Sequence, residues 1–185
     1  MSLATCVTMP ASTALLLLIV KLRGGPSPAD YMAAVDVPLS RILGWVGMTL
    51  ILGMVASVVS AAVDRPIPEF IISVYEGAYF YPVLWVGLVA CAPVYEEVLF
   101  RGFMFRGIAA SPLGPAGAVV LTAVVWSAAH FQYEHFELGM LIAFGLVLGM
   151  ARLRTRSLLP CIAMHAVFNL LAAIEAMAAL GLAGW

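Results

Sequence analysis

The chain alternates between long apolar runs and short polar connections. Five runs contain no Asp, Glu, Lys or Arg, and each approaches or reaches the roughly 20 residues that a helix needs to cross a bilayer. These runs are 1–20, 42–63, 77–95, 115–133 and 157–174. A sixth run, 138–151, reaches spanning length only if Glu137 or the flanking arginines lie at the membrane interface. The pattern predicts about six membrane spans.

The polar connections predict how these spans are oriented. Cytoplasmic loops of membrane proteins are enriched in Lys and Arg. The run RLRTR at 152–156 contains three arginines and the 21–41 connection contains three more basic residues, whereas the turns at 64–69 and 134–137 are net acidic. We therefore expect both basic connections to be cytoplasmic and the N-terminus to be outside. In this topology the third span covers 70–92 and runs back towards the cytoplasm.

Prolines suggest a further division of the chain. Proline is tolerated at the start of a helix and disfavoured inside one. Pro93 on one side, with Pro112 and Pro115 on the other, predicts a separate helical piece over 93–110 near the cytoplasmic side. The 24–38 stretch is rich in Gly and Pro, and we expect it to be a turn-rich loop and nothing more.

Composition agrees with a membrane protein and excludes other classes. Of the 185 residues, 64% are hydrophobic and 10% are charged, against about 25% charged in a soluble domain. A net charge of −1 gives no basic surface for nucleic acid. The cysteines are far apart in apolar runs, which predicts free thiols: Cys6, Cys91 and Cys161. We expect an all-α, polytopic bundle of about six to seven helices with a buried polar site, folded as one membrane domain over 1–185.

Ionisable residues inside such a bundle are candidates for function. Each costs on the order of 2.5 to 3.5 kcal/mol to insert at mid-membrane. The stretch PVYEEVLFRGFMFR contains Glu96, Glu97 and Arg101. On a helix, Glu97 and Arg101 are i,i+4 neighbours positioned for an ion pair, whereas Glu96 points about 100° away. A solvated surface pair is the alternative, but the flanking residues are too apolar for it. We therefore expect different roles for the two glutamates.

Two downstream motifs add polar groups. In WSAAH, His130 follows Trp126 by one helical turn, and in HAVFN, His165 and Asn169 share one helix face. If these faces converge with the glutamates, the combined set supplies a general base for a water and donors for a developing oxyanion. It also supplies an ion pair that holds the helix of the base in place. His165 and Asn169 alone would equally suit a polar pair that joins two helices.

These three motifs, in this order and in successive apolar segments, resemble the CPBP family of intramembrane proteases, also called the CAAX protease and bacteriocin-processing or Abi family. The resemblance covers about 85–175. The family more often has Phe where this chain has Trp126, which we interpret as a packing variation. The resemblance implies the following roles: Glu96 with His130 holds and activates the attacking water, His165 and Asn169 stabilise the oxyanion, and Glu97 with Arg101 orients the site.

The expected function is therefore an intramembrane endopeptidase with a glutamate-activated water, acting on a peptide or membrane-protein substrate in the plasma membrane, in particular a bacterial inner membrane. No cofactor is expected. Zinc stays open as an alternative through Glu96, His130 and His165, although the HExxH signature is absent.

A non-catalytic scaffold or immunity protein with the same fold is the main rival. A transporter using Glu96 as proton carrier predicts a sequence repeat, and none is visible.

One glycine pair bears on packing. Gly145 and Gly149 form a GxxxG pattern in the sixth apolar run. Small residues at this spacing let two helices approach closely. We expect them to serve packing within the fold, not a dimer.

Overall fold

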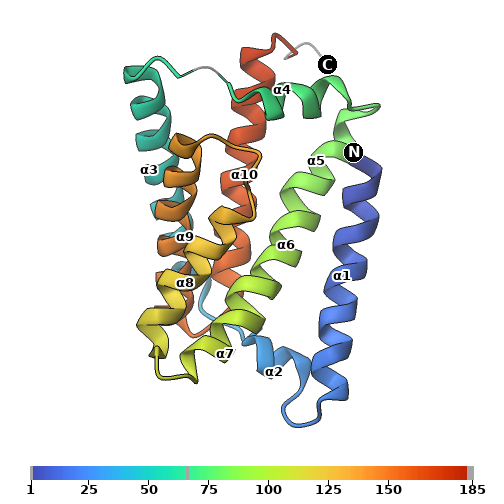
Figure 1. Cartoon of the computed structure of the whole chain (residues 1–185), viewed down its shortest axis with the longest axis vertical. Helices are drawn as coiled ribbons and strands as arrows, with labels where there is room; N and C mark the ends of the chain where they lie inside the picture. The colour runs from blue at the N-terminus through green and yellow to red at the C-terminus, as the bar shows by residue number, and fades with distance from the viewer. Residues whose placement is uncertain (1, 66, 183–185) are drawn as a thin grey trace.

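The computed structural model describes residues 2–65 and 67–182 and contains no strand within these ranges (Figure 1). Its helices are α1 (Ser2–Leu22), α2 (Pro28–Met32), α3 (Leu39–Ala62), α4 (Glu69–Glu76), α5 (Tyr81–Val86), η1 (Gly87–Cys91), α6 (Ala92–Glu97), η2 (Val98–Met104), α7 (Phe105–Ala109), α8 (Gly114–Ala128), α9 (His135–Thr155) and α10 (Leu159–Ala179). The segments η1 and η2 are π-helical.

Five helices are long and apolar enough to cross a membrane: Leu3–Leu22, Leu39–Ala62, Tyr81–Ala109, His135–Thr155 and Leu159–Ala179. The prediction of an all-α, multi-pass membrane bundle is therefore confirmed. The sixth apolar run belongs to a full-length helix that includes Glu137 near its start and Arg152 and Arg154 in its last turn.

The predicted span 115–133 is too long, because α8 has only 15 residues and ends at Ala128. The backbone at His130 shows how the helix ends, because the His130 N–H bonds to the Ser127 carbonyl, three residues back. The Nδ1 of His130 donates to the carbonyl oxygen of Trp126 at 2.8 Å, the acceptor that the backbone N–H of His130 would use if the helix continued. The 129–134 segment is then a turn that leads to the start of α9.

The prediction of a separate helical piece over 93–110 is wrong, because Tyr81–Ala109 is one continuous helix (Figure 1). A proline inside an α-helix lacks an N–H and clashes with the carbonyl four residues earlier. Here a π-turn precedes Pro93, and the N–H of Ala92 bonds to the Gly87 carbonyl, five residues back. The wider π-turn accommodates the proline ring. The glutamates therefore lie in the middle of a membrane span.

The 24–38 stretch is also more than a loop. Its middle forms α2, whose N-cap Ser27 accepts a hydrogen bond from the Asp30 backbone N–H. Tyr31 and Met32 at the end of α2 are buried and pack with a cluster of buried apolar residues from α1, η2 and the start of α10. A Cβ on Gly102 would meet the Met32 sulfur at 2.8 Å. The connection thus supports the helix that carries the glutamates.

Charge divides the two ends of the bundle. The start of α1 and the end of α10 lie at the same end as α4 (Figure 1). Helix ends and connections at the opposite end carry seven basic residues, Lys21, Arg23, Arg41, Arg106, Arg152, Arg154 and Arg156, and two acidic ones, Asp30 and Asp36. Those at the α4 end carry six acidic residues, Asp64, Glu69, Glu76, Glu134, Glu137 and Glu175, and one basic residue, Arg65. The predicted orientation therefore places the α4 end outside the cytoplasm.

Gly145 and Gly149 let α9 pack closely against α8. A Cβ on Gly145 would lie 3.0 Å from the Cα of Ala123, and one on Gly149 would lie 3.2 Å from the Cα of Val119. These contacts are with backbone, which cannot rotate away. The glycines therefore serve helix packing within the fold, as predicted.

We expect Gly145→Ala to destabilise the protein by about 1–3 kcal/mol, because the new methyl group overpacks the α8–α9 contact. Gly139→Ala is the matched control, since it lies on the same helix and a Cβ there meets nothing within 4 Å. That control should be neutral or slightly stabilising, because alanine favours helix more than glycine does. Thermal unfolding in detergent, followed by circular dichroism, compares the two. Equal transition temperatures would contradict the packing role of Gly145.

Candidate active site

Each of the three motifs contributes at least one polar residue to a cavity of 260 Å³. Glu96 reaches it from α6, His130 from the turn after α8, and His165 and Asn169 from α10. The remaining walls are mainly apolar and come from α1, α4, α5 and α9. Three segments far apart in the sequence thus present polar groups to one cavity.

The Glu96 carboxylate lies between the two imidazoles. Its Oε2 is 3.9 Å from the Nε2 of His130 and 3.9 Å from the Nε2 of His165. The same oxygen accepts a hydrogen bond of 2.6 Å from the Nε1 of Trp126. The Glu96 side chain is 15% exposed, so the carboxylate is oriented by protein groups and still reaches the cavity.

Glu97 points away from this cavity and is fully buried with Arg101. Their side chains form the predicted i,i+4 ion pair, with Nη1 and Oε1 separated by 3.0 Å and both side chains 0% exposed. Arg101 also donates through Nη2 to the Gly145 carbonyl. The Nδ1 of His165 lies 2.8 Å from the same Oε1 of Glu97. This ion pair therefore joins three helices, and the contact with His165 was not expected from the sequence.

The partners of each imidazole determine which nitrogen faces Glu96. The Nδ1 of His130 bonds to a backbone carbonyl, which can only accept, so that nitrogen carries the proton. The Nδ1 of His165 is assigned as the donor to the Glu97 carboxylate, because the same carboxylate oxygen accepts from Arg101. Both rings consequently turn Nε2 towards Glu96.

Asn169 satisfies a carbonyl that Pro93 leaves without a donor. In the π-turn the Leu88 carbonyl would accept from residue 93, which has no N–H. The Asn169 Nδ2 donates to this carbonyl at 2.8 Å instead. One N–H of the amide is thereby used, and the second remains for another acceptor in the cavity.

Two aromatic residues complete the cavity and were not assigned to it from the sequence. Trp126 is more than the packing variation we inferred, because it donates to Glu96. Tyr133 stacks on the His130 ring with the centroids 6.2 Å apart. Burial, followed by the nearby carboxylates of Glu96 and Glu137, raises the pKa of Tyr133 to about 12. Its hydroxyl therefore stays protonated at neutral pH. No sequence pattern marks Tyr133, since it lies in a turn after the motif.

Glu96, His130 and His165, the residues considered as zinc ligands, are not arranged as a metal site in this structure. Among the described residues, no group of three or more His, Cys, Asp or Glu is arranged to hold a metal. Ligand atoms of a tetrahedral zinc lie about 3.4 Å apart, whereas Glu96 Oε2 is 3.9 Å from either Nε2. The metalloprotease alternative has no support in this geometry.

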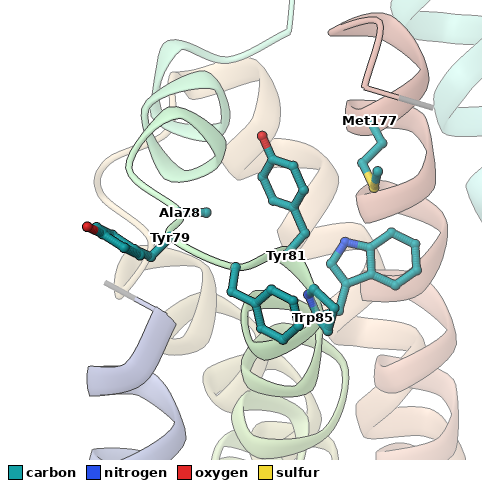
Figure 2. A pocket seen from close by; sticks show the side chains of 7 residues that line it. Ala78, Tyr79, Tyr81, Trp85 and Met177 are labelled. Carbon is teal, nitrogen blue, oxygen red and sulfur yellow. The ribbon is translucent and has the colours of Figure 1, made fainter. Parts of the chain in front are cut away.

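A larger cavity of 540 Å³ lies away from the polar cluster, between the start of α5 and the end of α10. Figure 2 shows Tyr79, Tyr81, Trp85 and Met177 around it. Tyr79 is fully exposed. Aromatic rings of this kind concentrate where a membrane meets water, so we assign this cavity to the interface and not to the chemistry.

The fold and the cavity define a class of protein: an all-α, multi-pass membrane protein with a carboxylate and two imidazoles around one cavity. Residues 78–171, which include all three motifs, match the family described as Type II CAAX prenyl endopeptidase Rce1-like. The chain belongs to this family, and at the level of the family it is a CAAX-protease-like intramembrane endopeptidase. The resemblance stated from the motifs is therefore confirmed. Neither a curated protein nor a solved structure matches the chain.

Proposed function

We propose that this chain hydrolyses peptide bonds with a water molecule that Glu96 deprotonates. The observation that supports this most directly is the 3.9 Å separation of Glu96 Oε2 from both Nε2 atoms. That distance is too long for a direct hydrogen bond, and it is short enough for one water to bond to the carboxylate and an imidazole together, at about 2.8 Å each.

In the proposed reaction Glu96 takes a proton from the water as the oxygen attacks the carbonyl carbon. The tetrahedral intermediate then loses its amine, which receives the proton from Glu96. His130 holds the water through Nε2. The carboxylate thus acts first as base and then as acid, and no covalent enzyme intermediate is needed.

The oxyanion of the intermediate is proposed to accept from His165 and Asn169. The Nδ1–H of His165 is bound to Glu97, so Nε2 becomes a donor when the ring is doubly protonated. The Glu97 carboxylate accepts from Nδ1 and fixes the orientation of the ring, as a buried carboxylate does for a catalytic histidine. Asn169 contributes the N–H that does not bond to Leu88.

The substrate is proposed to enter from the α4 end. From Glu96 the cavity extends towards that end, where α4 contributes Phe70, Ile71, Val74 and Tyr75. These apolar walls suit an extended peptide segment with apolar side chains. In the orientation predicted from the basic connections, such a segment reaches Glu96 from the extracytoplasmic side. The plasma membrane, and a bacterial inner membrane in particular, is the proposed location.

The test is cleavage of a peptide library by the protein purified in detergent, read by mass spectrometry with and without a chelator. We expect defined cleavage products, and we expect a zinc chelator to leave the rate unchanged because no ion takes part in the proposed steps. Loss of activity that zinc restores would assign the reaction to a metal. Peptide binding without any cleavage would instead support the scaffold or immunity function.

A further inference from the structure

Trp126 lies at the centre of the polar cluster and is 1% exposed. Its indole N–H donates to Glu96 Oε2 at 2.6 Å, a contact between residues 30 positions apart. Its backbone carbonyl accepts from His130 Nδ1. Trp126 therefore contacts both residues that are proposed to bind the water. Its side chain contacts Glu96, and its backbone contacts His130.

The indole ring is held in place on several sides. The guanidinium carbon of Arg101 lies 4.9 Å from the ring centroid, a distance at which a cation is attracted to an aromatic ring. Phe144 packs at 6.1 Å between centroids. The His165 ring meets the indole edge-on at 5.3 Å. A ring restrained in this way points its N–H in one direction.

We propose that Trp126 is a positioning residue that fixes the Glu96 carboxylate for its reaction with water; this rests on the proposed function. The indole N–H donates to Glu96 at 2.6 Å, whereas the Nε2 of either imidazole is 3.9 Å from the same oxygen. A carboxylate oxygen has two lone pairs, so this bond orients the group and leaves it able to accept from a water. Phenylalanine would fill much of the same space but has no N–H.

Trp126→Phe tests the inference through kinetics. A hydrogen bond to a charged group contributes enough free energy for about a 10- to 100-fold effect. We expect kcat to fall by that factor and KM to stay within about twofold, since the bond orients the base and does not hold substrate. Trp85→Phe is the matched control, because Trp85 lines the separate aromatic cavity; it should change neither constant. An unchanged kcat in folded Trp126→Phe would overturn the proposal.

A spectroscopic measurement tests the same bond without any activity. The chain has four tryptophans, and the signal lost in Trp126→Phe identifies the Trp126 indole N–H in a ¹⁵N–¹H NMR spectrum of the detergent-solubilised protein. Should that variant not fold, selective assignment of the wild type identifies the signal instead. We expect Glu96→Gln to shift the Trp126 indole signal by much more than the indole signals of the other three tryptophans. If it does not move, Trp126 does not act on Glu96, whether or not the protein is a peptidase.

Discussion

Glu96→Gln is expected to lower kcat/KM for peptide cleavage at least a hundredfold while leaving the fold intact. Glutamine has the size of glutamate but cannot take a proton from water, and a general base contributes about 10²- to 10⁴-fold to a rate. The Trp126 N–H can still donate to the amide oxygen at this position. The loss should therefore be chemical and not structural.

The control for this variant is Glu76→Gln, which makes the same substitution at an exposed carboxylate on α4. It should cleave peptides at the wild-type rate. Cleavage rates over a range of substrate concentrations, together with thermal unfolding of each variant, separate a lost base from a lost fold. A Glu96→Gln protein that cleaves as fast as wild type would rule out Glu96 as the base.

Arg101→Met is expected to destabilise the protein by about 3–5 kcal/mol, the cost of removing one partner of a buried ion pair. The substitution leaves the Glu97 carboxylate, which is 0% exposed, beside His165 alone. It also leaves the Gly145 carbonyl without the donor it has from Arg101. The contacts of this ion pair connect three helices, so the substitution should lower the stability of the whole bundle.

Unfolding in mixed detergent micelles measures this cost. Arg65→Met is the comparison, because Arg65 pairs with Glu134 and Glu137 at the surface and is partly exposed; solvent and salt screen such a pair, so its loss should change stability little. Adding Glu97→Leu to Arg101→Met should recover part of the stability by removing the unpaired charge. If the Arg101→Met and Arg65→Met proteins unfold with equal stability, the buried ion pair does not hold the helices together.

The structure departs from the sequence interpretation mainly where proline and histidine affect local backbone. Pro93 predicts a helix start by its usual preference, but the π-turn before it lets the helix continue. The apolar run 115–133 predicts a full span, but α8 ends at Ala128 and the backbone N–H of His130 bonds three residues back, to Ser127. In both cases the local backbone hydrogen bonding differs from that of a regular α-helix, which hydropathy does not report.

The sequence by itself determined the membrane class, the helical fold and the separate directions of Glu96 and Glu97. These follow from hydropathy and from helical periodicity, which act between residues close together in the chain. The tertiary structure alone decided that Trp126 donates to Glu96, that His165 bonds to Glu97, and that Asn169 bonds to Leu88. Each joins residues 30 to 81 positions apart, and whether such groups meet depends on how the helices pack against one another, which local patterns do not specify.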